Sequence, residues 1–183
     1  MTYYGSKELA ASFRTVRANT IKMAEEIPED KYDFRPTPES RSVAQTLVHV
    51  AVSVKLQQLV HFTGEPLNTL VGLDFFALMG AIIAEEQKPR TKAEILELLK
   101  TEGEKFATQL EGCTEEFLAQ SVQYPEGMMP PTKSRFEMVM APKEHEMHHR
   151  GQLMLVQRMI GLTPHLTRQM QERVAAMAAA QKA

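Results

Sequence analysis

Apolar residues recur at intervals of three and four along most of the chain, which is the period of an amphipathic helix. Four long segments show this pattern: residues 6–27, about 42–62, 91–112 and 134–160. In the first, Leu9, Phe13, Val16 and Met23 share one face, and charged residues fill the other positions. The second segment is apolar around most of the helix circumference, which is typical of a helix buried on most sides. The pattern predicts an all-α protein.

Local signals mark where these helices begin and end. The segments Thr91-Lys92-Ala93-Glu94 and Ser134-Arg135-Phe136-Glu137 both have the pattern of a capping box. Pro28 ends the first helix, Gly112 the third, and Gly161 with Pro164 the fourth. The helix boundaries are therefore predicted by side chains that lie within one turn of them.

The connections between the helices differ in character. Residues 29–41 contain two prolines, and we expect an extended linker pinned by Tyr32 and Phe34. Residues 64–90 are predicted to be a crossover with a short helix near Phe75 that covers one end of the domain. Residues 114–133 are predicted to form a short helix near Phe117 and then a Pro- and Met-rich loop over the bundle.

A fifth, weaker helix is expected after Pro164, with Leu166, Met170, Val174 and Met177 on one face. It would pack either on the bundle or on a partner chain. The 183 residues fit one domain, 1–183, with a sizeable core. Four long helices with two irregular crossovers predict a four-helix bundle with long crossovers and an extra C-terminal helix.

The composition limits which partners the protein is expected to bind and in which cellular compartment it is expected. A net charge of -2 and a pI near 6.3 give no excess of basic charge for binding nucleic acid. The first twenty residues lack the apolar core of a signal peptide, and no stretch is long and apolar enough to span a membrane. Cys113 is the single cysteine, so no internal disulfide forms. These absences predict a cytoplasmic protein without a membrane or nucleic-acid partner.

Candidate chemistry lies in the fourth helix. His145 and His149 are four residues apart, so a helix presents both imidazoles to the same point, as a divalent metal requires. Both belong to the inward stripe of that helix, and His49 is expected to point inward from the second helix. Taken alone, His49 is more often a buried structural histidine, so the histidine pair carries the metal hypothesis.

Two stretches resemble a known family. The segment Ser42-Val43-Ala44-Gln45-Thr46-Leu47-Val48-His49, combined with His145-Glu146-Met147-His148-His149-Arg150-Gly151-Gln152, is similar to the DinB/YfiT-like superfamily. That resemblance implies a four-helix bundle, frequent dimerisation, and a divalent metal bound by His49, His145 and His149. The metal would be Zn, Ni, Mn or Fe.

Three neutral imidazoles would leave a divalent metal with open coordination positions, as in catalytic sites. We expect acceptors among Glu144, Glu146, Gln45 and Gln152 to orient the rings. Characterised members of the resembled family include S-transferases that use a low-molecular-weight thiol, and this is the leading hypothesis. The substrate would lie under residues 73–79 and 128–131.

Two alternatives remain open at this stage. One is a metal-dependent hydrolase of a small amide or ester, in which Glu144 or Glu146 would act as general base. The other is a non-catalytic, stress-associated metal-binding dimer. In the enzymatic hypotheses the partners are a small-molecule substrate, with a thiol for the transferase, and a second copy of the chain forming a homodimer.

Other polar residues are assigned structural or surface roles. His148 lies beside the inward stripe and is expected at the surface, whereas His61 and His165 are expected to be structural or exposed. Arg150 most simply forms an ion pair. Cys113 has acidic neighbours, which would raise its pKa, so it is not expected to be a nucleophile.

Overall fold

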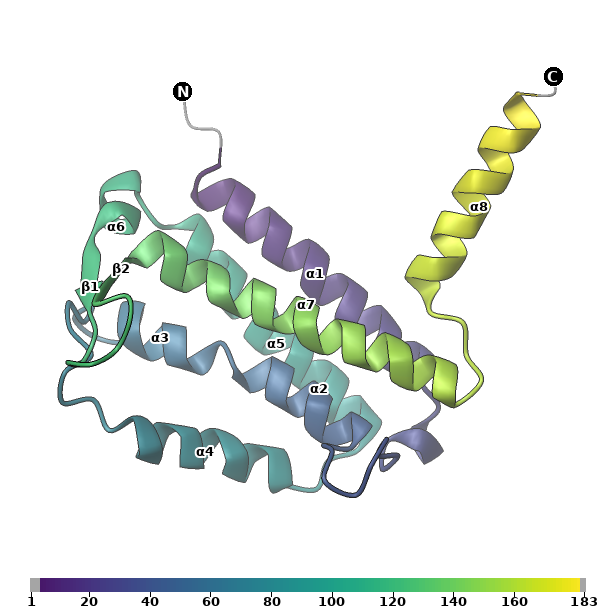
Figure 1. The fold of residues 1–183 in the computed structure, drawn as a ribbon, viewed down its shortest axis with the longest axis horizontal. Helices are drawn as coiled ribbons and strands as arrows, with labels where there is room; N and C mark the ends of the chain where they lie inside the picture. Colours follow the sequence, from purple (N-terminus) through teal and green to yellow (C-terminus); the bar gives the residue numbers. More distant parts are fainter. Residues whose placement is uncertain (1–3, 182–183) are drawn as a thin grey trace.

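The four predicted long helices form the body of the protein in a computed structural model that describes residues 4–181 (Figure 1). They are α1 (Ser6–Glu26), the pair α2 (Val43–Val52) and α3 (Lys55–His61), α5 (Lys92–Glu111) and α7 (Arg135–Met159). Helix α1 packs against α5 and α7, and α2 packs against the same two helices. The arrangement is the predicted four-helix bundle.

The helix ends match the signals in the sequence. Thr91 and Ser134 cap α5 and α7 as expected, each accepting a hydrogen bond from the backbone of the glutamate three residues later. Ser42 caps α2 in the same way. These caps satisfy backbone N–H groups that a helix start would leave unpaired, which is why short sequence patterns locate the starts correctly.

The second predicted helix is not continuous. It is interrupted at Ser53 and Val54, where the Ser53 hydroxyl donates a hydrogen bond to the Val50 carbonyl. A serine side chain that bonds to a nearby carbonyl competes with regular helix, and the apolar periodicity does not report this competition. The two pieces still occupy one position in the bundle, so the bundle prediction is unaffected.

The crossover from Gly64 to Arg90 differs from the expectation. It contains α4 (Phe75–Gln87), a longer helix than predicted, which packs along α2 instead of covering one end of the bundle. Figure 1 shows α4 on the outer side of α2 and α3. Because α4 lies beside α2, it brings its own side chains close to His49.

The Pro- and Met-rich connection contains more structure than a loop. The short helix α6 (Glu115–Ala119) is confirmed, but strands β1 (Ser121–Gln123) and β2 (Thr132–Ser134) then pair as an antiparallel hairpin. In that hairpin Ser121 pairs with Ser134 and Val122 with Lys133, so β2 leads directly into α7. A three-residue strand is too short to show a period of two in the sequence.

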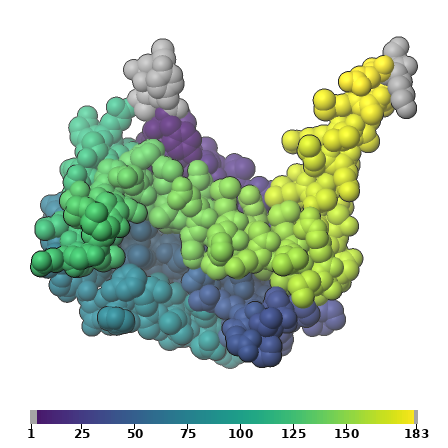
Figure 2. Space-filling view, in the orientation of Figure 1, coloured from purple at the N-terminus to yellow at the C-terminus, as the bar shows by residue number. Residues whose placement is uncertain are grey.

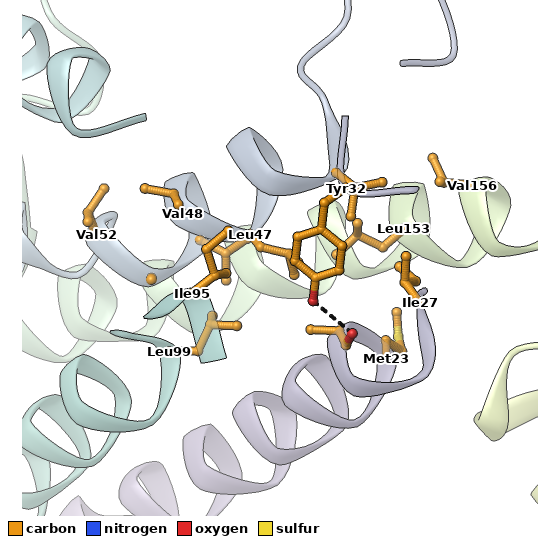
Figure 3. Packing of buried hydrophobic residues seen from close by; sticks show 14 of the residues in the cluster. Met23, Ile27, Tyr32, Leu47, Val48, Val52, Ile95, Leu99, Leu153 and Val156 are labelled. Carbon is orange, nitrogen blue, oxygen red and sulfur yellow. Dashed lines mark hydrogen bonds between the residues drawn. The ribbon is translucent and has the colours of Figure 1, made fainter. Parts of the chain in front are cut away.

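The largest hydrophobic cluster lies between α1, α2, α5 and α7, with the linker of residues 29–41 closing one side (Figure 3). The linker begins with a short 3-10 helix (Glu29–Lys31). Tyr32 then inserts its ring into the cluster, and its hydroxyl donates a 2.8 Å hydrogen bond to the Ala24 carbonyl. Phe34 packs against the same cluster, so the two aromatic rings pin the linker as predicted.

Helix α8 (His165–Ala180) projects away from the bundle (Figures 1 and 2). Its first turn is anchored, because His165 is buried and its Nε2 lies 3.1 Å from the Asn19 side-chain oxygen. Beyond Arg168 its described residues are exposed, including Met170, Val174 and Met177. Contacts with the bundle therefore hold only the first turn of α8 in place.

Among the residues that the structure describes, no helix is both long and apolar enough to cross a bilayer.

Candidate metal centre

The candidate site lies where α2 faces α7. The Ser42 cap fixes the start of α2, and His49 follows two helical turns later on the face turned toward α7. On α7, His145 and His149 lie one turn apart. His49 is 8% exposed and His149 is 7% exposed, while His145 is half-buried. The structure thus brings all three predicted histidines together from two helices.

The three rings converge through their Nε2 atoms. The Nε2 of His145 lies 3.0 Å from that of His49 and 3.1 Å from that of His149, and all three ligand atoms lie within 4.8 Å of one another. Two nitrogens about 2.1 Å from one zinc ion and roughly 90–110° apart would be separated by about 3.0–3.4 Å. The two distances from His145 therefore fit pairs of nitrogens that share one ion.

The far nitrogens of two rings have acceptors that fix their orientation. The Nδ1 of His49 donates to the Glu86 carboxylate at 2.7 Å, and the Nδ1 of His149 donates to the Gln152 side-chain oxygen at 2.8 Å. With the proton on Nδ1, each Nε2 presents a lone pair toward the centre. Lone pairs crowded in this way repel one another unless a cation or a proton lies between them, so the donor set fits a metal.

Glu86 was missed in the sequence analysis. It is 6% exposed and comes from α4, where its other oxygen accepts a 2.6 Å hydrogen bond from Arg41. Its one signal in the sequence is its place four residues after Ile82, since these are the two buried residues of α4. That signal could be interpreted only if the crossover were known to contain a helix packed on α2.

Of the four residues expected to orient the histidine rings, one does so and three have other surroundings. Gln152 does orient His149, but Gln45 belongs to the α2 capping box and also contacts Gln87. Glu144 is exposed. Glu146 points away from the cluster into the core, where both its oxygens accept hydrogen bonds from the Arg17 Nε at 3.0 Å. Neither glutamate serves as an acceptor for the three rings.

Burial keeps the histidines neutral. It lowers the pKa of His49 and His149, and it lowers the pKa of His145 to about 4, with the neighbouring histidines acting in the same direction. The charged imidazolium is disfavoured because the surroundings solvate it poorly. Neutral imidazole is the form that binds metal, so the site is prepared for a ligand role at neutral pH.

A comparison with known protein families shows which family the chain belongs to. The model of the DinB superfamily matches residues 12–153, which include all three histidines. The protein belongs to the DinB superfamily.

Relatives of this DinB-superfamily chain are found in bacilli. The Bacillus subtilis protein YjoA is 27% identical over 158 residues, covering 86% of this chain and 92% of YjoA. The crystal structure of YjoA, described as DinB-like, superposes with a TM-score of 0.62 at 24% identity, covering 85% of this chain and 93% of that one.

A second solved structure is YfiT from Bacillus subtilis, described as a probable metal-dependent hydrolase with an unusual four-helix bundle topology. It superposes with a TM-score of 0.66 at 13% identity, covering 89% of this chain and 91% of YfiT. At this identity the likeness establishes the fold.

Members of the histidine cluster of the DinB-superfamily chain line two cavities. A cavity of about 960 Å³ with a mixed lining has His148, His149, Arg35 and Arg41 among its polar residues and Ile83 and Leu155 among its apolar ones. A second pocket, which is apolar and about 220 Å³ in volume, is lined by residues that include His49, His145, Leu56, Met79, Ile82 and Pro142. The histidine cluster therefore contributes to both cavities: His149 lines the larger one, and His49 and His145 line the apolar pocket.

Only part of the expected substrate cover is present. Met79 lines the apolar pocket, as predicted for residues 73–79. Residues 128–131 were predicted wrongly, because Met128, Met129 and Pro131 line a separate cavity of about 760 Å³ that none of the three histidines lines. The hairpin holds these residues at the far end of α7, because β2 ends where α7 begins.

The remaining candidates have structural or surface roles. His148 is exposed and contacts Gln152, and His61 is buried against Arg135. Burial raises the pKa of the Cys113 thiol to about 11, so this cysteine is not an activated nucleophile.

Proposed function

We propose that the protein is a metal-dependent S-transferase that joins a low-molecular-weight thiol to a small electrophile. The observation that carries this proposal is that the three converging imidazoles line two cavities, one that contains two arginines and one that is apolar. A two-substrate reaction is accelerated when both reactants are held next to the reacting atoms, and two cavities lined by one cluster could hold one reactant each. The residues that would hold the divalent metal are His49, His145 and His149.

A divalent cation held there would lower the pKa of a thiol or water molecule placed in its open position. In the proposed transfer the thiol loses its proton to solvent and its sulfur forms a bond to the electrophilic carbon. The leaving group departs with the electron pair of the bond that breaks. The protein orients the two reactants and keeps water out of the apolar side.

The arginines of the larger cavity suit an anionic thiol. Arg35 is exposed and lines this cavity, and Arg41 lines it while donating a hydrogen bond to Glu86. Guanidinium groups bind carboxylates through paired hydrogen bonds. The apolar pocket, with Met79 and Ile82 in its wall, suits an uncharged electrophile.

Hydrolysis is the second candidate, and the description of YfiT as a probable metal-dependent hydrolase supports it. A hydrolase of this kind needs a general base beside the metal. Glu146 is paired with Arg17, and both oxygens of Glu86 have partners in His49 and Arg41. A thiol has a lower intrinsic pKa than water, so its transfer depends less on such a base. For this reason we rank the transferase first.

The metal hypothesis has a direct test. His145→Ala and His149→Ala should each abolish stoichiometric metal retention, because either change leaves two protein ligands. Metal content should be measured by elemental analysis of protein purified without a polyhistidine tag, which also decides among Zn, Ni, Mn and Fe. His148→Ala is the matched control, since His148 is exposed and outside the cluster of three nitrogens. Unchanged metal content in either ligand variant, with helicity retained, would refute the assignment.

A thiol screen then separates the enzymatic hypotheses. The metal-loaded protein is incubated with several cellular thiols and a general electrophile such as monochlorobimane, and conjugate formation is followed. Acceleration that is lost in His145→Ala supports the transferase. Turnover of an ester panel without any thiol effect would favour the hydrolase, and silence in both assays would favour a non-catalytic metal-binding protein.

A further inference from the structure

The apolar pocket beside the histidine cluster extends along α2, α3 and α7. Helices α2 and α3 both pack on α7, and Figure 1 shows them one after the other along its length. The pocket is lined by His49, Ser53 and Gln57, which follow one another at intervals of four residues, and by Ala141 and His145 from α7. At 1.5 Å per residue, His49 and Gln57 are about 12 Å apart along the helices. The pocket therefore reaches from the histidine cluster to Gln57.

Most polar side chains that line this pocket already have partners or are out of reach. Both ring nitrogens of His49 are used in the arrangement of the candidate metal centre. The Ser53 hydroxyl donates its hydrogen to the Val50 carbonyl, and the Nδ1 of His145 is enclosed by protein. Among the described residues that line the pocket, Gln57 is the remaining polar side chain.

A buried series of hydrogen bonds fixes the orientation of the Gln57 amide. Arg135 is fully buried, and its Nη1 donates to the Nδ1 of His61 at 2.8 Å. An arginine can only donate, and burial lowers the pKa of His61 to about 4, so the neutral ring carries its proton on Nε2. That Nε2 donates to the Gln57 Oε1 at 3.0 Å. The side-chain oxygen of Gln57 is therefore occupied by His61.

The amide nitrogen of Gln57 is left with two N–H donors and no acceptor. Gln57 is 7% exposed, and within residues 4–181 its Nε2 has no hydrogen-bond partner. This nitrogen is not among the fully enclosed polar atoms that lack a partner, so a ligand can reach it. An unpaired donor in apolar surroundings costs free energy, and an oxygen atom of a ligand would remove that cost.

We propose that Gln57 determines the specificity of the apolar pocket by donating a hydrogen bond to the far end of the bound electrophile. The ligand is an uncharged molecule with an apolar body. Its reactive carbon lies beside the histidine cluster, and a carbonyl oxygen at its other end lies beside Gln57. A carboxylate is disfavoured there, because no arginine or lysine is among the described residues that line the pocket. That the ligand is an electrophile rests on the proposed function, whereas the preference for a carbonyl oxygen rests on the pocket alone.

Binding of two unreactive ligands tests the proposal without any turnover. Acetophenone and isopropylbenzene have nearly the same shape, but only acetophenone has a carbonyl oxygen. Dissociation constants for the full chain are measured by NMR titration of the methyl signal of Met79, a residue of the pocket wall, which is assigned with Met79→Leu. We expect Gln57→Met to shift the ratio of the two constants by about 3- to 10-fold against acetophenone, as for the loss of one neutral hydrogen bond.

Gln58→Met is the matched control. Gln58 is the next residue of α3 and is 6% exposed, but it donates to Gln109 and does not line the pocket. The ratio should therefore stay at its wild-type value in this variant. A second readout needs no variant: acetophenone should shift the side-chain amide proton signals of Gln57 in the wild-type protein to lower field, and isopropylbenzene should not.

Three outcomes would overturn the proposal. One is a ratio that is the same in Gln57→Met and in the wild type, or Gln57 amide signals that respond equally to both ligands. Another is an equal shift of the ratio in Gln58→Met, which would assign the effect to the packing of α3. The third is a Met79 signal that responds to neither ligand. Failure of the proposed function is distinguishable, because a protein with the expected binding ratios that conjugates no thiol would refute the transferase and support the role of Gln57.

Discussion

At the scale of single residues, the candidate site depends on groups that orient the histidine rings. Glu86 accepts a hydrogen bond from His49 and Gln152 accepts one from His149, so both rings are held with Nε2 toward the centre. Such acceptors set the tautomer and raise the basicity of the ligand nitrogen. Gln152 lies three residues after His149 and was predicted from the sequence. Glu86 lies 37 residues after His49 and was missed.

We expect Glu86→Gln to weaken metal binding by about 10- to 100-fold without abolishing it, because the three ligands remain but the charged acceptor is lost. Competition with a metal-binding dye measures the change. Glu85→Gln is the matched control on the same helix, since Glu85 pairs with Lys88 and Arg90 and not with a histidine. An equal loss of metal affinity in the two variants would show that removing any carboxylate from α4 weakens binding, and that the contact between Glu86 and His49 is not the cause.

His61 makes stability depend on pH. Burial lowers its pKa from 6.5 to about 4 in the folded protein, with Arg135 acting in the same direction. Between these two values the unfolded chain binds a proton that the folded chain does not, so the free energy of unfolding falls as pH falls.

One proton corresponds to a slope of about 1.4 kcal/mol per pH unit. Urea unfolding at several pH values between the two pKa values should therefore show a shallower pH dependence in His61→Gln than in the wild type. Identical slopes would mean that His61 takes up its proton equally in both states.

At the scale of elements, a buried ion pair joins the helices that carry the ligands. Arg17 on α1 pairs with Glu146 on α7 and donates to the backbone carbonyls of Leu99 and Val50 on α5 and α2. Glu146 and Val50 are each next in sequence to a histidine of the cluster. The pair therefore fixes how α2 and α7 face each other.

Arg17→Ala should destabilise the protein by about 3–5 kcal/mol, because it leaves the buried Glu146 carboxylate without its ion-pair partner. Arg14→Ala should cost about 1 kcal/mol or less, since the Arg14 pairs with Glu104 and Glu111 are solvent-exposed. Both variants remove an arginine from α1, so chemical denaturation compares a buried with an exposed pair directly. Equal costs would contradict the structural role assigned to Arg17.

At the scale of the whole molecule, the candidate metal centre would act as a cross-link within the bundle. His49 and His145 are 96 residues apart in the chain, and one ion held between them would tie α2 to α7. A ligand that binds only the native state stabilises it by mass action, by about 4 kcal/mol when its concentration is 1,000 times its dissociation constant.

A chelator should therefore lower the melting temperature of the metal-loaded protein, and added metal should restore it. The His145→Ala variant should show a single melting temperature under both conditions, because it retains no ion. Differential scanning fluorimetry measures these shifts. A chelator effect that persists in His145→Ala would mean that the stabilising ion binds elsewhere.

The sequence by itself determined the long helices α1, α5 and α7 and their inward faces. Apolar spacing, capping boxes and the glycine and proline stops act over one or two turns, so the bounds of α1, α5 and α7 follow from neighbours in the chain. The same local geometry places His145 and His149 on one face. The family resemblance added His49 to this pair, which its own position alone would not have done.

Only the tertiary structure decided what meets across the bundle. The approach of Glu86 to His49, the pairing of Arg17 with Glu146, and the separation of residues 128–131 from the site all depend on how whole elements pack. Packing is set by the summed fit of many side chains over long sequence separations, so no short pattern records it. The orientation of the Gln57 amide was decided in the same way, since Arg135 on α7 meets His61 on α3 only through the packing of these two helices.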